Sequence, residues 1–189
     1  MATESSRVSR DRIPKGREEV AAAVLTAAAD LFAERGPAAT SIRDIAARSK
    51  VNHGLVFRHF GTKEQLVGAV LDYIAGDLAA LLQSGAAPAV VDRAIDRQMR
   101  VWARARLDGY PTEKLQTSFP NVDQWLEQVL PRYGDDTAAR LAIANALALQ
   151  LGWRLFEPML RSATGLEDLG DAELRSAVVA AAARLTEPD

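Results

Sequence analysis

Residues 40–63 constrain the fold more than any other part of the chain, because two short helical patterns meet there at a tight junction. Ser41 opens the first pattern, and Asp44 follows three residues later, the spacing of a capping box. A turn follows at Ser49-Lys50, and Asn52 can cap the second helix. The stretch therefore predicts two short helices joined by a tight turn, which is the helix-turn-helix arrangement.

The second helix of this pair is too polar on one side to be ordinary core. At 100° per residue, His53, Gly54, Phe57 and Arg58 fall on one side, with Asn52 and Leu55 at the margins. The opposite side can pack on the first helix. The expected packing set is Ile45, Ala46, Val51, Val56 and Phe60. His59 can either pack beneath the helix or face outward.

The exposed residue types suit contacts with double-stranded DNA. Arginines at 43 and 58 could donate two hydrogen bonds to guanine, and Asn52 could pair with adenine. Leu55 could touch a thymine methyl group. Gly54 lets the backbone come close to DNA, and Lys63, at the start of the next helix, suits a phosphate. The competing interpretation is an ordinary solvated helix face.

Charge is distributed unevenly along the chain. Residues 1–64 contain 11 lysines and arginines against 8 acidic residues, whereas residues 65–189 contain 12 against 17. Residues 1–16 are polar, with Arg7, Arg10, Arg12 and Lys15, and predict a disordered basic arm. Such an arm can either reach DNA or remain a solvated tail. A basic N-terminal third suggests that this end meets phosphates.

Composition excludes several classes of protein. The 189 residues include no cysteine, which rules out disulfides, thiolate catalysis and cysteine-ligated zinc. The two histidines both fall within 53–59, so no histidine and carboxylate cluster suggests a metal site. No apolar run approaches the length of a membrane span, and no apolar signal core opens the chain. We therefore expect a cytoplasmic protein without membrane contact, metal or cofactor.

Hydrophobic periodicity predicts an all-α chain. No strand-like alternation is present, whereas apolar positions recur at helical spacing throughout. A kink is expected at Pro158, a capping role for Asp171, and a surface pair of Arg154 and Glu157. Residues 112–119 could be a short helix or a loop. Outside the helix-turn-helix, the expected helices are 17–35, 63–82, 88–107, 121–130, 136–162 and 172–185.

Residues 17–70 resemble the DNA-binding domain of the tetracycline-repressor (TetR) family. The resemblance rests on Ile45-Ala46 followed by Phe57-Arg58-His59-Phe60-Gly61-Thr62-Lys63, which matches the family's Ile/Leu-Ala and aromatic-x-x-Phe-x-x-Lys segments. Phe57 departs from the usual tyrosine, whose hydroxyl holds a phosphate, and Lys50 replaces a common glycine. The DNA-facing sites that the resemblance implies are Ser41, Arg43, Asn52, His53, Gly54, Leu55, Phe57, Arg58 and Lys63.

The resemblance also implies how the rest of the chain is organised. Residues 1–16 would be the arm, 17–70 the helix-turn-helix domain, and 71–189 an all-helical domain for ligand binding and dimerisation. Alanine-rich faces on the last two helices could form a homodimer interface or intrachain core. A small apolar or amphipathic effector would bind in this domain. The candidate ligand residues are Met99, Trp102, Trp125, Asn145, Gln150 and Trp153.

The function that these features favour is a transcriptional regulator, expected to be a ligand-responsive homodimeric repressor that binds a palindromic DNA operator. Two alternatives remain at this level. One is a helical interaction module that has lost DNA binding, for which the missing hydroxyl at Phe57 is the argument. The other is a helical enzyme, although no nucleophile and base motif supports catalysis.

Overall fold

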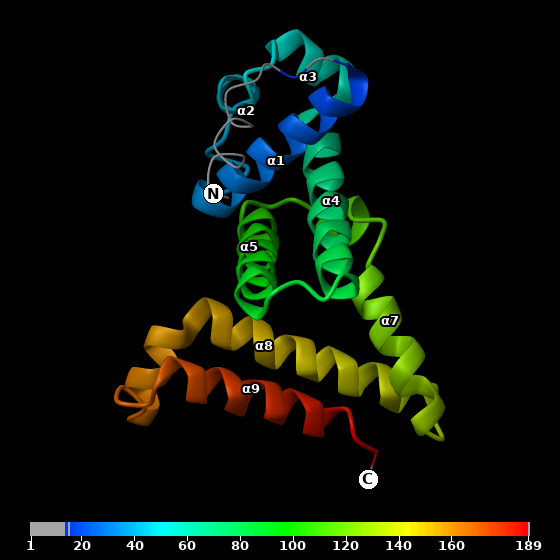
Figure 1. Cartoon of the computed structure of the whole chain (residues 1–189), viewed down its shortest axis with the longest axis vertical. Coiled ribbons are helices and arrows are strands. Elements are labelled where there is room, and N and C mark those ends of the chain that lie inside the picture. Colours follow the sequence, from blue (N-terminus) through cyan, green and yellow to red (C-terminus); the bar gives the residue numbers. More distant parts are fainter. Residues whose placement is uncertain (1–13, 15, 189) are drawn as a thin grey trace, which may run out of the picture. The chain divides into compact units, whose positions relative to one another are not determined.

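The computed structural model describes Pro14 and residues 16–188, and every regular element in that part of the chain is helical (Figure 1). The predicted all-α fold is therefore confirmed. Residues 112–119, ambiguous in sequence, contain one helical turn, and a 3₁₀ turn covers Leu130–Arg132. The α-helices are α1 (Arg17–Arg35), α2 (Ile42–Ser49), α3 (His53–Phe60), α4 (Lys63–Gln83), α5 (Pro88–Leu107), α6 (Thr112–Leu115), α7 (Pro120–Val129), α8 (Asp136–Thr164) and α9 (Asp171–Leu185).

The chain forms two compact units. The described residues up to Ile74 and the segment Arg100–Thr117 make the N-terminal unit, and the C-terminal unit consists of Ala75–Met99 and the residues from Ser118 onward. The boundary expected at residue 70 lies close to this division. Residues 100–117, expected in the second domain, instead pack with the helix-turn-helix. The basic arm lies outside the described residues, apart from Pro14 and Gly16.

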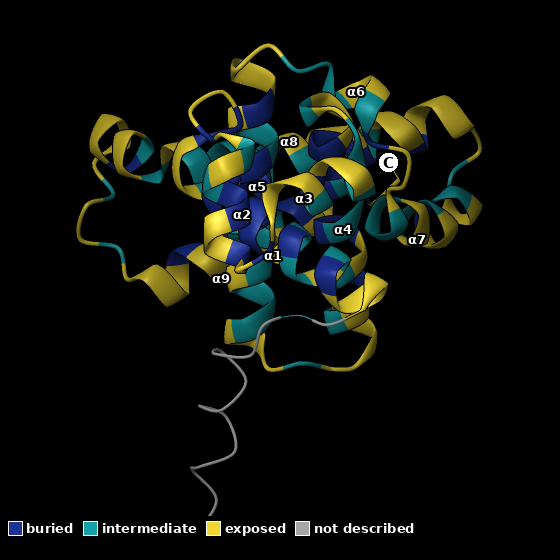
Figure 2. Cartoon of the chain, turned by 90° about the horizontal axis from the view of Figure 1, so that it is seen from above, coloured by how far each residue is buried: buried dark blue, intermediate teal, exposed yellow. Residues whose placement is uncertain are grey.

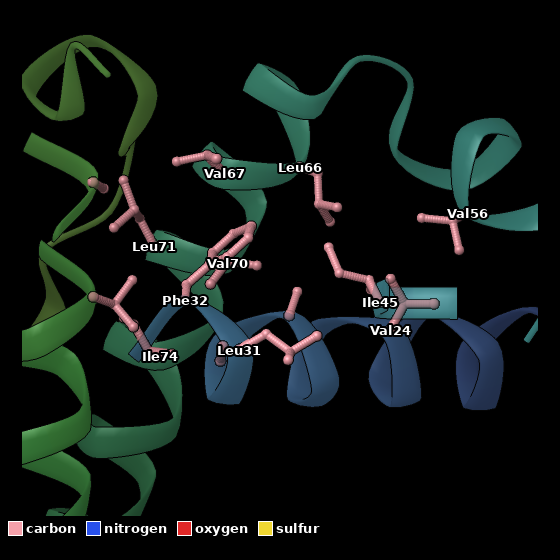
Figure 3. Packing of buried hydrophobic residues seen from close by; sticks show 14 of the residues in the cluster. Val24, Leu31, Phe32, Ile45, Val56, Leu66, Val67, Val70, Leu71 and Ile74 are labelled. Carbon is pink, nitrogen blue, oxygen red and sulfur yellow. The ribbon is translucent and has the colours of Figure 1, made fainter. Parts of the chain in front are cut away.

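The N-terminal unit is built around one apolar core (Figure 3). Helix α1 contributes Val24 and Phe32, and Ile45 of α2 and Val56 of α3 pack against them, each at most 1% exposed. Helix α4 closes this core with Leu66, Val67, Val70 and Leu71. The predicted packing set is confirmed, because Ala46, Val51 and Phe60 also belong to the cluster or pack against it.

Helix α4 is long and apolar enough to cross a membrane by length and composition alone. Half of that apolar window is buried inside the protein, however. Its fully buried Leu66 and Val70 contact the core of the N-terminal unit. These core contacts account for much of the apolar composition of α4.

The α1–α2 turn is fixed from two sides. Gly36 ends α1 with a φ of 82°, and its carbonyl accepts a 2.8 Å hydrogen bond from the buried Thr40 hydroxyl. The backbone N–H of Ala38 donates a 2.7 Å hydrogen bond to Oδ2 of Asp108, just beyond the end of α5. This contact, 70 residues apart in sequence, sets the turn from which α2 begins.

Helices α8 and α9 run side by side and antiparallel in the C-terminal unit (Figure 1). Arg161, 9% exposed, closes their connection by donating to the carbonyls of Leu166 and Leu169 and to carboxylates of Glu157 and Asp171. Two predictions fail here. Asp171 caps nothing, since Gly170 is the N-cap and has no side-chain bond, and Glu157 pairs with Arg161 rather than with a surface partner three residues away.

Proline bends α8 as the sequence predicts. Phe156 has a non-helical backbone with φ −121° and ψ 15°, two residues before Pro158. Proline lacks the N–H that would bond the carbonyl four residues earlier, and its ring crowds that carbonyl. The helix begins as expected, because the Asp135 carboxylate accepts hydrogen bonds from Thr137 N and Ala138 N at 3.2 and 3.1 Å.

Candidate DNA-binding site

Helix α2 is held by a complete capping box. Ser41 Oγ accepts from Asp44 N at 3.1 Å, and Ser41 N donates to Asp44 Oδ2 at 2.8 Å. These hydrogen bonds, followed by the nearby Arg35 charge at 3.0 Å, lower the pKa of the Asp44 carboxyl. Ser41, a predicted DNA contact, therefore uses its hydroxyl oxygen as a helix cap and offers DNA its remaining hydroxyl hydrogen.

The turn between α2 and α3 contains a left-handed residue at Lys50, the position where the family commonly has glycine. Lys50 has φ 57° and ψ 31°, the left-handed conformation, and it is the one non-glycine with positive φ among the described residues. Lys50 N and Val51 N donate to the carbonyls of Ala47 and Ala46, and Val51 is buried. A left-handed lysine costs on the order of 1 kcal/mol, and these bonds and the burial of Val51 offset that strain.

Helix α3 begins with its polar residues outward. Asn52 Oδ1 accepts from Gly54 N at 2.8 Å, which confirms Asn52 as the N-cap. Since that oxygen is engaged, the amide nitrogen of Asn52 is the group left for a base. His53 and Gly54 are exposed beside it, and Figure 2 shows where α3 lies among the exposed and buried parts of the chain. A Cβ on residue 54 would lie 3.3 Å from Asn52 Oδ1, so glycine also leaves room for the cap.

Ion pairing separates the arginines of this region into two groups. Arg35 pairs with Asp44 at 3.0 Å, and Arg48 binds both carboxylate oxygens of Glu34 at 3.1 Å. These pairs tie α1 to α2. Arg43 and Arg58 are exposed and form no ion pair with any residue that the structure describes. Their guanidinium groups are therefore not engaged by the described part of the protein, and their role as DNA contacts stays a prediction.

Lys63 lies in the first turn of α4 and is half-buried. Burial lowers the pKa of its ammonium group, and the carboxylates of Asp108 and Asp44 oppose that shift. Thr62, directly before Lys63, forms a capping box with Gln65. Thr62 N donates to Gln65 Oε1 at 2.8 Å, and Gln65 N donates to Thr62 Oγ1 at 3.2 Å. Lys63 thus places a positive charge beside the amino end of a helix, where a phosphate is favoured.

Two aromatic or apolar members of the predicted set differ sharply in exposure. Phe57 is 65% exposed on α3, whereas Leu55 is half-buried and packs against the core. Phe57 lies beside Arg58 on the exposed side of α3 and lacks the hydroxyl that a tyrosine would bring. Its contact with the DNA backbone stays a prediction.

The structure adds residues that sequence reasoning did not assign to this site. Arg17 and Gly16, at the start of α1, line a hollow together with Leu55, Arg58 and His59 of α3. His59 is half-buried there, so neither simple alternative, buried packing or an outward face, describes it. Arg17 is exposed, and a basic residue at the amino end of the first predicted helix is the sequence feature that could have identified it.

The predicted ligand residues are not brought together. Trp102 packs on the core of the N-terminal unit, where its indole N–H donates to Gln116 at 2.7 Å. Trp125 packs in a separate cluster near α7 and α8, Met99 is buried, and Asn145 is exposed. Gln150 and Trp153 do line one cavity in the C-terminal unit. Spacing on single helices could not show which tryptophans face one another.

Comparisons with known proteins agree with this geometry. Residues 24–70 match the family described as "Bacterial regulatory proteins, tetR family". The HTH-type transcriptional repressor Rv3405c of Mycobacterium tuberculosis (strain ATCC 25618 / H37Rv) is 66% identical over 179 residues, covering 95% of each chain. The HTH-type transcriptional regulator Mb3439c of Mycobacterium bovis gives the same values. The HTH-type transcriptional repressor KstR2 of Mycolicibacterium smegmatis is 38% identical over 69 residues, 34% of each chain.

A helix-turn-helix with an exposed, partly unpaired basic face, together with such relatives, defines a DNA-binding transcriptional regulator and not an enzyme. The near-complete coverage at 66% identity extends the match beyond the helix-turn-helix to the whole chain. The chain belongs to the tetR family of bacterial regulatory proteins.

Proposed function

We propose that this protein is a ligand-responsive homodimeric repressor in the cytoplasm that binds a palindromic operator. The observation that carries the DNA-binding part is the exposed face of α2 and α3, where Arg43 and Arg58 are left unpaired beside Asn52 and His53. Repression is supported by the Mycobacterium tuberculosis relative, which is named a transcriptional repressor. Within the site, Arg43, Asn52, His53 and Arg58 would read bases, and Ser41 and Lys63 would position the protein on phosphates.

The outer faces of α8 and α9 support the homodimer. Large apolar side chains are exposed on both helices, including Leu141, Phe156 and Met159 on α8 and Leu185 on α9, at 42 to 58% exposure. A second subunit packed on these two neighbouring helices would remove such side chains from water. Two such helix pairs, one from each subunit, would form a four-helix bundle. A two-fold dimer carries two recognition helices, which fits an operator with two half-sites.

Ligand response requires that an effector prefer one shape of the dimer over another. The C-terminal unit contains a cavity that could hold such an effector. An effector that stabilises a shape whose recognition helices no longer match the spacing of successive major grooves would release the operator.

Selection from a pool of random duplexes with the purified full-length protein tests this proposal. The expected product is an inverted repeat with half-sites about one helical turn apart, bound more weakly as salt rises. Recovery of no preferred sequence, or of sequences bound equally well by an Arg43→Ala, Arg58→Ala double variant, would contradict it. A reporter placed behind the selected operator then separates repression from activation.

A further inference from the structure

A cavity of about 310 Å³ lies in the C-terminal unit and is lined by residues of α5, α8 and α9. This volume is at the lower end of the range for small-molecule sites. Trp153 of α8 and Leu174 and Val178 of α9 supply apolar surface to its lining. Leu174 is 5% exposed and Val178 is half-buried, whereas the neighbouring Val179 is 64% exposed, so the apolar wall on α9 opens towards solvent at one side. The cavity can hold an apolar body of one or two rings or a short branched chain.

The acidic side chains around this cavity are already engaged. Asp92 of α5 accepts a 2.6 Å hydrogen bond from Arg154 of α8 in an ion pair. Glu157 accepts from Arg161 at 2.9 Å. Asp96 also has an interaction partner within the protein. The carboxylates therefore serve the internal structure and leave little negative charge to attract a cation.

Two arginines line the same cavity and, unlike these acids, have no partner among the residues that the structure describes. Arg93 comes from α5 and Arg175 from α9, and both line the cavity and are exposed. Neither forms an ion pair or side-chain hydrogen bond with a residue that the structure describes. Guanidinium groups bind carboxylate and similar anions through paired N–H donors. The cavity thus combines an apolar wall with two unused planar cation groups from different helices.

We propose that this cavity binds an amphipathic organic anion, with its apolar body against Trp153 and Val178 and its anionic group held by Arg93 and Arg175. The inference rests on the proposed ligand response, since it names the effector class and the effector site. A bound anion would join α5 to α9 through its two arginines. Arg154 and Asp92 already join α8 to α5 beside the same cavity.

Two fluorescent probes that differ by one charged group test the inference on the full-length protein. 8-Anilinonaphthalene-1-sulfonate carries a sulfonate, and N-phenyl-1-naphthylamine has the same aromatic body without it. The double variant Arg93→Gln, Arg175→Gln should bind the sulfonate probe with an affinity lower by about tenfold or more, because two charge-assisted contacts are lost. The neutral probe should change by less than about twofold. Arg140→Gln, an exposed arginine of α8 outside the cavity, is the matched control and should change neither.

A filling variant locates both probes. Val178→Trp should weaken the sulfonate and the neutral probe together, since it occupies the space that their shared aromatic body needs. Unchanged sulfonate affinity in the double arginine variant would overturn the inference, as would an equal loss in Arg140→Gln or an equal loss of the neutral probe in the double variant. Binding of a selected duplex without probe is measured in parallel. If the protein binds a selected duplex but the arginine variants bind the sulfonate probe as the parent does, only the anion site is refuted. If the sulfonate probe depends on the arginines but no duplex is selected, only the proposed repressor is refuted.

Discussion

Replacing Asp108 with alanine should loosen the turn that leads into the helix-turn-helix. The Asp108 carboxylate accepts the backbone N–H of Ala38 at 2.7 Å, the contact that joins the end of α5 to the α1–α2 turn. Hydrogen bonds to charged groups contribute about 1.5–3 kcal/mol, and exposure of this one to water places it at about 1–2 kcal/mol. For a chain of this length that loss corresponds to a fall in melting temperature of roughly 2–8 °C.

Gly36 allows the same contact to be tested from the other side. A Cβ added at Gly36 would lie 2.6 Å from Asp108 Oδ2, and the glycine itself has φ 82° and ψ 160°. Gly36→Ala should therefore lose about 1–3 kcal/mol through backbone strain and also displace the Asp108 carboxylate. Once Asp108→Ala has removed that carboxylate, the second cost disappears. The double variant should then be more stable than the sum of the single losses predicts, by about 1–2 kcal/mol.

Thermal unfolding at one fixed protein concentration, followed by circular dichroism, measures all four proteins of this cycle. A fixed concentration is needed because association would shift the melting temperature. Glu113→Ala, an exposed acid on α6, is the matched control and should lie within about 0.5 kcal/mol of the parent. Losses that add within about 0.5 kcal/mol would show that Asp108 and Gly36 do not interact as the geometry requires, and the reasoning would be refuted.

Three further predictions concern DNA and the dimer. Arg58→Ala should lower the affinity for the preferred duplex by about 1–3 kcal/mol and relax the sequence preference at one position. Lys63→Ala should lower the affinity for all duplexes alike and reduce the slope of log affinity against log salt by about 1. The opposite pattern in competition binding would reverse their roles. Phe57→Tyr should strengthen all duplexes by about 0.5–1 kcal/mol through a new phosphate hydrogen bond, and unchanged affinity would place residue 57 off the backbone. Leu185→Glu should produce monomers in sedimentation at concentrations where the parent is dimeric, and an intact dimer would exclude the exposed side of α9 at Leu185.

Local chemistry made the helix-turn-helix predictable. Capping boxes at Ser41 and Thr62, the cap at Asn52 and the left-handed Lys50 depend on residues two to four positions apart, so the sequence contains both partners. The family resemblance placed these local signals in one known arrangement. Element bounds differed from the structure by only a few residues for the same reason, as where α7 begins at Pro120 rather than Asn121.

Contacts between distant segments were not predictable in the same way. Asp171 was expected to cap α9, but its carboxylate forms an ion pair with Arg161 of α8 instead. Of the six expected ligand residues, Gln150 and Trp153 line the same cavity and the other four do not. Helical spacing gives the direction of a side chain on its own helix and not the identity of the facing helix. Trp102 illustrates this, since Gln116 in the N-terminal unit satisfies its indole N–H.

The pairing of charges explains how a chain of net charge −2 can present a basic face to DNA. Two acids beside the helix-turn-helix, Glu34 and Asp44, are bound by Arg48 and Arg35, so their fields are largely cancelled within a few ångströms. Arg43 and Arg58 remain uncancelled on the exposed side. Charge-sensitive binding depends on such local excess, because beyond about 8–10 Å exposed charges are screened at physiological salt. The charge at this face is therefore set by Arg43 and Arg58 and their immediate neighbours, and not by the net charge of the whole chain.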